Sequence, residues 1–217
     1  MSISSLRSLK HANYIHPTAV IDESAIIGEG NYIGPYCIIG KDVVIGNNNR
    51  LEAHCSIGMP PEHRDFWKSS YKSVVIGNDC IIREYATVNS GTTTNTVIGN
   101  NVSLLHACYV AHDCIVGDNV TISGNSAMGG HCIIHEGANI GLNVSIHQYS
   151  VIGHYAMLGM GTVIPKKTKI EPLNTYVGNP ARFLKPNQYA VKKYNLTVLD
   201  IERFNKEFAA NLSKMRK

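Results

Sequence analysis

Charged residues are scarce in this 217-residue sequence, at 17%, and only 7% of it is aromatic, with a single tryptophan. No apolar run approaches the roughly 18 residues that a membrane-spanning helix needs. The first residues also lack the apolar core, about 7–15 residues long, of a secretory signal peptide. With a hydrophobic content of 44%, the composition indicates a soluble globular protein, which we expect to be cytoplasmic and without a membrane span.

Cysteine pairs and basic clusters are missing as well. The six cysteines include no Cys-x-x-Cys pair, which argues against disulfides and against a cysteine zinc site. The net charge of +4 suits a phosphate-bearing small molecule at least as well as nucleic acid. Because the basic residues do not form a face interleaved with aromatic residues, we expect no nucleic-acid partner.

What the sequence does contain is a repeat of six residues. Glycine often follows the repeated aliphatic residue, as in "IIGEGNYIGPYCIIGKDVVIGNNN". Only methionine departs from the aliphatic type. The repeated positions are Ile15, Ile21, Ile27, Ile33, Ile39, Ile45, Leu51, Ile57, Ile76, Ile82, Val88, Ile98, Leu104, Val110, Val116, Ile122, Met128, Ile134, Ile140, Ile146, Ile152, Leu158, Ile164 and Ile170.

A period of six fits neither an α-helix nor an alternating strand. It is typical of a parallel β-helix, in which each hexad forms a short strand and a turn and three hexads close a triangular coil. The aliphatic residues then stack into a continuous core, and glycine and asparagine are expected at the positive-φ corners. The sequence therefore predicts an all-β domain of about eight coils over residues 1–172.

Two segments break the period and are predicted to leave the prism as loops, residues 59–75 and 90–97. Loops extruded from a repeat scaffold are usually functional, although a tolerated insertion is the alternative. Residues 173–217 are predicted to form a loop and, from about Thr197, a short amphipathic helix that packs on the prism or on a partner subunit. Its apolar positions are Val198, Ile201, Phe204, Phe208, Leu212 and Met215.

One set of polar residues follows the repeat. His112, His131 and Gln148 are 19 and 17 residues apart, each close to one coil of three hexads. Since stacked strands lie about 4.8 Å apart, we expect these residues in one column on a prism face, beside the glycine pair Gly129–Gly130 that would admit a ligand to the backbone. Solvated polar residues are the structural alternative, but the column favours a functional site.

The motifs "IHPTAVI", "IGPYCIIG", "IREYATVNSGT", "AHDCIVG", "GGH" and "HQY" occur in this order. With them the chain resembles the hexapeptide-repeat acyltransferases, and especially the UDP-N-acetylglucosamine O-acyltransferases that begin lipid A synthesis. The likeness runs from about Ile15 to Asn195. It implies left-handed coils and a homotrimer with sites between subunits.

The resemblance also implies roles for individual residues. His112 corresponds to the general base and Asp113 to the acid beside it. Arg182, within "GNPAR", is expected to bind the donor, and no metal or bound cofactor is required. The residues expected to bind the substrate are Asp65 in the first extruded loop, Asn89, Gly130, His131, Gln148 and Lys193, the last in a basic pair with Lys192.

Acyl transfer from a thioester needs a base for the nucleophile and hydrogen-bond donors for the developing oxyanion. An imidazole suits the first task near neutral pH, and backbone N–H groups around Gly129–Gly130 are candidates for the second. Asp113 would orient the imidazole of His112. Adjacent strand residues point to opposite faces, however, so a backbone carbonyl is the alternative.

The chain departs from the family in three places. Asn89 and Tyr109 stand where the family has histidines, and the long C-terminal helical domain is replaced by a short tail. Because coenzyme A needs only a cleft and a few cations, we expect acetyl transfer from acetyl-CoA to an amino or hydroxyl group of a UDP-type amino sugar, for lipopolysaccharide or surface-glycan synthesis. The alternative is an acyl-carrier-protein-dependent UDP-N-acetylglucosamine O-acyltransferase of lipid A biosynthesis.

Two other functions are compatible with the repeat. The metal-dependent β-helical carbonic anhydrases gather three histidines, two of them typically five residues apart on one coil. Here His131 and His135 are four apart, and the "AHDC" and "HQY" motifs resemble those of acyltransferases. A non-catalytic scaffold would share the repeat without needing the polar column.

Overall fold

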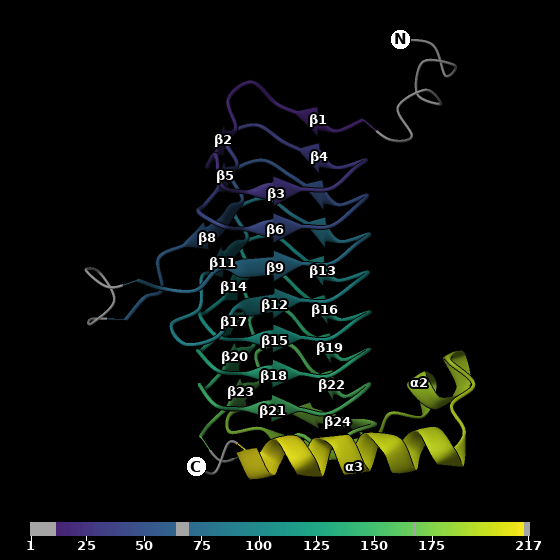
Figure 1. Ribbon diagram of the computed structural model, residues 1–217. Coiled ribbons are helices and arrows are strands. Elements are labelled where there is room, and N and C mark those ends of the chain that lie inside the picture. The colour runs from purple at the N-terminus through teal and green to yellow at the C-terminus, as the bar shows by residue number, and fades with distance from the viewer. Residues whose placement is uncertain (1–11, 64–69, 167, 215–217) are drawn as a thin grey trace.

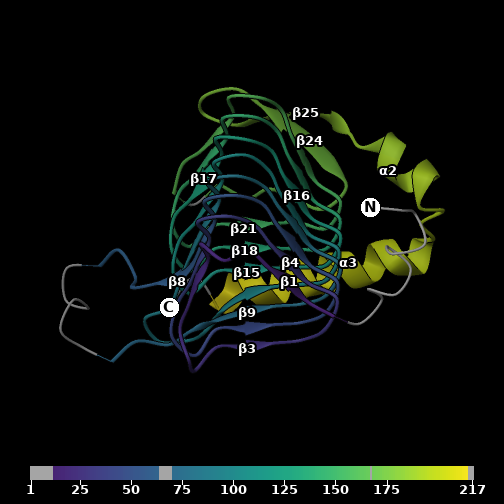
Figure 2. The ribbon, with the colours of Figure 1, turned by 90° about the horizontal axis from the view of Figure 1, so that it is seen from above.

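The computed structural model describes residues 12–63, 70–166 and 168–214. Short parallel strands stack in three sheets (Figure 1) and wind into a β-helix that is triangular when seen along its axis (Figure 2). The coils match left-handed β-helix structures, which confirms the predicted fold class. None of the described helices is long and apolar enough to cross a membrane.

The first sheet contains β1 (Tyr14–Ile15), β4 (Tyr32–Ile33), β7 (Arg50–Leu51), β10 (Ile81–Ile82), β13 (Ser103–Leu104), β16 (Thr121–Ile122), β19 (Asn139–Ile140), β22 (Met157–Leu158), β24 (Asn174–Val177) and β25 (Arg182–Pro186). The second contains β2 (Val20–Ile21), β5 (Ile38–Ile39), β8 (Ser56–Met59), β11 (Thr87–Asn89), β14 (Tyr109–Val110), β17 (Ala127–Met128), β20 (Ser145–Ile146) and β23 (Val163–Ile164). The third contains β3 (Ile26–Ile27), β6 (Val44–Ile45), β9 (Val74–Ile76), β12 (Thr96–Ile98), β15 (Ile115–Val116), β18 (Ile133–Ile134) and β21 (Val151–Ile152). Only β25 runs antiparallel to its neighbour among these strands.

The core is a column of the repeated aliphatic residues. In the second sheet Val110 lies opposite Met128, and Met128 lies opposite Ile146, because neighbouring coils are in register. The repeated residues are buried from Ile33 onward, whereas Ile15 in the first coil is 43% exposed. Each coil therefore buries its apolar residues only by stacking on the next one.

The corners differ from the prediction in residue type. Asparagine and glycine occupy several positive-φ positions, but so do Tyr36, His54 and Ala107. Most glycines that follow an aliphatic residue are needed for space instead. A Cβ on Gly46 would lie 2.6 Å from the carbonyl oxygen of Gly77 on the next coil. Close stacking, more than backbone conformation, selects glycine at such positions.

The chain leaves the prism between β8 and β9 and between β11 and β12 (Figure 1), although the strands extend into both predicted loop ranges. At the other end β24 pairs with β22, so the first sheet continues past residue 172 and begins a ninth coil. The strand β25 and the short helix α2 (Gln188–Lys193) were not predicted. The division into domains at residue 172 stays a prediction.

The C-terminal helix α3 (Val198–Lys214) lies across the C-terminal end of the prism of its own chain (Figure 1). Thr197 and Asp200 bond reciprocally at its start, since the Asp200 N–H donates to the Thr197 hydroxyl and Asp200 accepts from the Thr197 N–H, as in a capping box. Phe204 and Phe208 are buried as expected, whereas Val198, the first residue of the helix, is 71% exposed.

Candidate active site

The predicted column lies on the second sheet, where β14, β17 and β20 are consecutive neighbours. One part of the prediction needs correction. The equivalent positions, 18 residues apart in these registered strands, are His112, Gly130 and Gln148. His131 is one position later and shares its place with Asp113 and Tyr149. The 19-residue spacing thus puts His131 at a corner, where it reaches His112 from the side.

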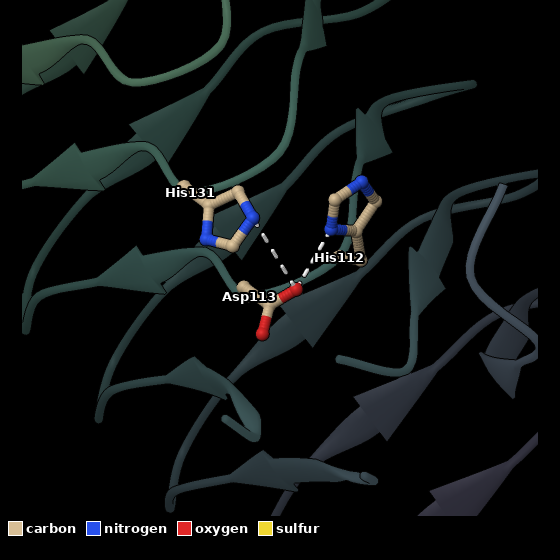
Figure 3. Close-up of side chains that lie close together, drawn as sticks. All are labelled: His112, Asp113 and His131. Carbon is tan, nitrogen blue, oxygen red and sulfur yellow. Dashed lines mark hydrogen bonds and ion pairs between the residues drawn. The ribbon is translucent and has the colours of Figure 1, made fainter. Parts of the chain in front are cut away.

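Two adjacent residues form the centre of the site. His112 Nδ1 lies 2.7 Å from Asp113 Oδ2 (Figure 3), and both residues are buried, at 8% and 5% exposure. Asp113 has a φ of 59°, so it belongs to a turn and not to a strand. The expected difficulty, that neighbouring strand residues face opposite ways, does not arise, and the carboxylate orients the imidazole.

The Asp113 carboxylate is surrounded by the loop between β11 and β12. Its Oδ2 accepts from the Thr92 N–H at 2.8 Å and the Thr92 hydroxyl at 2.7 Å. Its Oδ1 accepts from the N–H groups of Thr93 and Thr94 at 2.8 and 2.7 Å. The hydroxyls of these two threonines also donate to it. The three consecutive threonines therefore form a cage around one buried charge.

This cage decides the charge state of Asp113. Burial alone would raise its pKa, but the hydrogen bonds from the Thr92 hydroxyl and from the backbone N–H groups of residues 92–94 outweigh burial and hold the pKa well below the usual range. An ionised carboxylate can only accept hydrogen bonds. His112 Nδ1 must therefore donate, which leaves the Nε2 lone pair of the neutral imidazole free to take a proton.

Gly130 lies against the His112 ring. A Cβ on Gly130 would come within 2.5 Å of Cε1 and 2.7 Å of Nε2 of His112. The glycine pair also differs in hydrogen bonding, because the Gly129 N–H donates to the Ile146 carbonyl at 2.9 Å. Among the described residues no acceptor bonds the Gly130 N–H. Of the two predicted oxyanion donors, Gly130 alone has its N–H available.

His131 completes the cluster drawn in Figure 3. Its Nε2 is 3.8 Å from Asp113 Oδ2, and its ring meets that of His112 edge-on at 5.2 Å. On the other side it stacks on Tyr149 at 4.6 Å. Burial lowers the pKa of His131, and the His112 ring lowers it further, against the raising effect of Asp113. At neutral pH a neutral His131 is suited to hydrogen bonding with an uncharged ligand group.

Two connected depressions lie over these residues. The first is polar and is lined by Glu62, Tyr109, Ala111, His112, Gly129, Gly130, Ile146, His147 and Gln148. The second is an almost wholly apolar groove of about 450 Å³, lined by Tyr109, Ala127, Met128, Gly129, Ser145, Ile146, His147, Val163, Ile164 and Pro165. They share Tyr109, Gly129, Ile146 and His147, so an apolar surface continues directly from the pocket over His112.

Several residues around the pocket are not marked as site residues by any sequence motif. Tyr109 donates its hydroxyl to Glu62 Oε2 at 3.0 Å and accepts from Asn89 Nδ2 at 3.2 Å. The His63 ring is edge-on to His112, with centroids 6.1 Å apart. Glu62 and His63 belong to the first extruded loop, whose functional character was predicted but whose contacts depend on how it folds back. Asn89 thus lies beside the pocket, behind Tyr109.

Three predicted residues are not brought to this pocket. Asp65 lies outside the described residues. Lys193 is on α2, which lies across the prism from β17 in both views (Figures 1 and 2), and it contacts the rings of Tyr189 and Tyr194. Arg182 is on β25 of the first sheet and is exposed. Neither basic residue lines either depression of its own chain.

The described residues do not form the three-histidine arrangement expected of a carbonic anhydrase. His131 groups with His112 and Asp113, whereas His135 groups with His154 and Glu207 at another corner of the prism. The two histidines nearest each other in sequence therefore belong to separate clusters.

Comparison with known proteins agrees with this geometry. The sequence profile described as bacterial transferase hexapeptide (six repeats) matches residues 24–58 and 95–130. The acyl-[acyl-carrier-protein]–UDP-N-acetylglucosamine O-acyltransferase of Azorhizobium caulinodans is 46% identical over 63 residues, which are 28% of this chain and 23% of that protein. The matched part thus spans about a quarter of this relative.

Solved structures extend the similarity over most of the chain. The UDP-N-acetylglucosamine acyltransferase of Francisella novicida has a TM-score of 0.76 at 28% identity, covering 88% of this chain and 77% of that one. The UDP-N-acetylglucosamine O-acyltransferase of Moraxella catarrhalis has a TM-score of 0.70 at 30% identity, covering 88% and 82%.

The hexapeptide repeat and this similarity show that the chain belongs to the hexapeptide-repeat acyltransferase family. Within it, the chain resembles the UDP-N-acetylglucosamine O-acyltransferases.

Proposed function

We propose that the protein transfers an acyl group from an acyl-carrier-protein thioester to a hydroxyl of UDP-N-acetylglucosamine, in the cytoplasm, with His112 as general base. The observation that carries this proposal is the His112–Asp113 pair, 2.7 Å apart, beside an apolar groove. The pair supplies a base next to a space that fits an acyl chain.

The reaction follows from the groups in the pocket. His112 Nε2 takes the proton of the sugar hydroxyl while the hydroxyl oxygen attacks the thioester carbonyl carbon. The carbon–sulfur bond of the resulting tetrahedral intermediate then breaks, and the departing thiolate takes the proton back from His112. The products are an ester and a free thiol, and the ionised Asp113 stabilises the imidazolium between the two steps.

Other residues would bind the substrate and the intermediate. The unbonded N–H of Gly130 is the candidate donor to the oxyanion. Gln148 and His147 line the pocket and are exposed, so their side chains can bond the sugar. His131 would contribute an uncharged donor or acceptor beside His112.

The groove and the relatives favour the carrier-protein donor over acetyl-CoA. An acetyl group is too small to fill an apolar groove of about 450 Å³. A longer acyl chain would gain about 0.8 kcal/mol of binding free energy for each CH₂ group buried there. The relatives named above include an enzyme that takes acyl groups from an acyl carrier protein. The preference for acetyl-CoA, which rested on the short tail, is therefore replaced by the alternative.

We also infer a homotrimer with sites between subunits. The pocket over His112 is lined by residues that follow β14, β17 and β20 of the second sheet. Helix α2, which ends at Lys193, lies on the opposite side of the same prism from β17 (Figure 2). Phosphates of a nucleotide bound near His112 would therefore meet Lys193 or Arg182 only from another subunit.

The activity is tested with a panel of donors and acceptors. Acetyl-CoA and acyl carrier proteins loaded with short and long acyl or hydroxyacyl chains are incubated with UDP-N-acetylglucosamine and related nucleotide sugars, and the products are weighed by mass spectrometry. We expect a kcat/KM at least about tenfold higher with a carrier-protein donor, since only a long chain fills the groove. A preference for acetyl-CoA would refute the proposed donor, and no acyl transfer with any pair would refute the function.

The assembly is tested separately. The solution mass should be three times the chain mass of 23.8 kDa. Inactive His112→Ala protein is mixed with inactive Lys193→Ala protein under conditions that let subunits exchange. Activity should return, because some interfaces then pair an intact His112 from one subunit with an intact Lys193 from the other. A fully active monomer would rule out shared sites.

A further inference from the structure

A second cluster of chemically active side chains lies away from the catalytic pocket, where α3 crosses the end of the prism. His135 follows β18 and His154 follows β21 on adjacent coils of the third sheet. Their rings lie 4.2 Å apart, and Phe204 of α3 stacks on the far side of His154 at 4.4 Å. Two coils and one helix therefore meet at a pair of imidazoles.

The helix presents two polar residues, one turn apart, to these rings. Glu207 Oε2 lies 3.0 Å from His154 Nε2, and Asn211 Nδ2 lies 3.2 Å from His135 Nε2. One ligand-type atom from each of His135, His154 and Glu207 lies within 4.8 Å of the other two. Small side-chain movements would bring all three to the roughly 2.0–2.2 Å that zinc requires.

Burial and charge suit a cation. His135 and His154 are 8% and 3% exposed, so bulk water does not compete for their ring nitrogens. Glu207 brings a carboxylate to the same cluster, and that negative charge favours a cation. In the described structure His154 Nδ1 is buried without a hydrogen-bond partner, so hydrogen bonding within the protein leaves this side chain incompletely satisfied.

We propose that His135, His154 and Glu207 bind a zinc ion that fastens α3 to the β-helix. Two neutral imidazoles and one carboxylate form a donor set typical of zinc. The Glu207 side chain is 45% exposed, so a water molecule can reach the remaining position from the solvent side. The ion would hold the helix in place and would take no part in acyl transfer.

The test uses the full chain, stripped with a chelator and titrated with zinc by calorimetry and with cobalt by visible absorption. We expect one saturable site and the absorption of tetrahedral cobalt. Zinc at a hundredfold excess over Kd should raise Tm by roughly 5 °C or more. It should also slow amide exchange in residues 198–214, because bound metal opposes undocking of the helix.

Matched variants locate the ion. Glu207→Gln keeps a hydrogen-bonding partner for His154 but removes the anionic ligand, and His135→Gln removes one nitrogen ligand. Each should weaken zinc binding roughly 100-fold while retaining the circular dichroism of the β-helix. The control Glu202→Gln, at an exposed position of α3, should bind zinc like the original protein.

Two results would overturn the proposal. One is the absence of saturable zinc binding. The other is unchanged affinity in both Glu207→Gln and His135→Gln, which would place the ion at His112, Asp113 and His131 instead, since these form the other candidate cluster among the described residues.

Discussion

Gly130 lies so close to His112 that a Cβ at position 130 would be 2.7 Å from Nε2 of the imidazole. The ring therefore occupies the space that any side chain at position 130 would need. Its orientation is set from two sides, by Asp113 at Nδ1 and by Gly130 beneath the ring.

Gly130→Ala should reduce activity without unfolding the protein. The added methyl group must push the ring out of line with Asp113, and a displacement of about 1 Å costs on the order of 10²-fold in rate. Steady-state kinetics and Tm would be measured together. Gly161→Asn is the control, because Gly161 has a φ of 68° and open space around its Cβ. Activity of Gly130→Ala within about threefold of the original would contradict this packing argument.

His112→Ala should lower turnover roughly 10²–10⁴-fold, as expected for loss of a general base. The fold should persist because the side chain is not part of the aliphatic core. The matched control is His106→Ala, an exposed histidine whose ring lies edge-on to that of Tyr85. If His112→Ala retained more than about a third of the activity, another residue would have to accept the proton.

Thr92→Val should destabilise the protein. It removes the hydroxyl that donates to Asp113 at 2.7 Å while keeping a β-branched shape. Because the acceptor is ionised and buried, the free energy of unfolding should fall by about 1.5–3 kcal/mol, as measured by urea denaturation at pH 7. Thr121→Val, on the outer side of β16, should change it by less than about 0.5 kcal/mol. Equal effects of the two substitutions would show that the cage adds no stability.

Ser145→Trp should shorten the preferred acyl chain. Ser145 lines the apolar groove and is exposed, so a large ring there would occupy the space of the distal carbons. We expect kcat/KM to drop at least about tenfold for long acyl donors and much less for short ones, since each displaced CH₂ forfeits about 0.8 kcal/mol. Ser103→Trp, at the corresponding strand position of the first sheet, is the control. A uniform loss across chain lengths would mean that the groove does not hold the acyl chain.

His154 should make stability depend on pH in metal-free buffer. Burial, followed by the charges of His135 and Arg203, lowers its folded pKa to about 3, while the unfolded value is about 6.5. Between these pH values the unfolded chain binds a proton at residue 154 and the folded chain does not. The free energy of unfolding therefore has its full value above about pH 6.5 and falls as the pH decreases toward 3. Glu207, 3.0 Å away, is the carboxylate that faces this ring.

The measurement compares urea unfolding at several pH values between 4.5 and 6.5 for the original protein and His154→Gln. For each unit by which the pH is lowered, the free energy of unfolding of the variant should fall by up to about 1.4 kcal/mol less than that of the original protein. The exposed His106→Gln should keep the original slope. Identical slopes in all three proteins would mean that His154 is protonated equally in both states.

The six-residue period predicted both the fold and the sheet that holds the site. An aliphatic residue at each sixth position can be buried only if hexads stack in register, so His112 and Gln148 had to lie on one face. The same reasoning placed His131 in their column, and there it was wrong by one position. His112, Gly130 and Gln148 are each the first residue of a turn, and His131 is the second residue of its turn. Its φ of 60° turns the side chain sideways.

Tertiary structure decided the rest. The threonine cage is formed by a loop that interrupts the repeat. The six-residue period therefore does not predict that this loop folds against Asp113. Strand β25 and the helices α2 and α3 follow the last hexad of the repeat. Apolar spacing there predicts that one face of a helix is buried, but it does not identify the residues, such as His135 and His154, that this face contacts. The sequence thus determined the β-helix and the candidate base, since the repeated aliphatic residues can be buried together in few arrangements other than stacked coils. Only the folded chain determined which loops and which helix meet the polar residues at its corners.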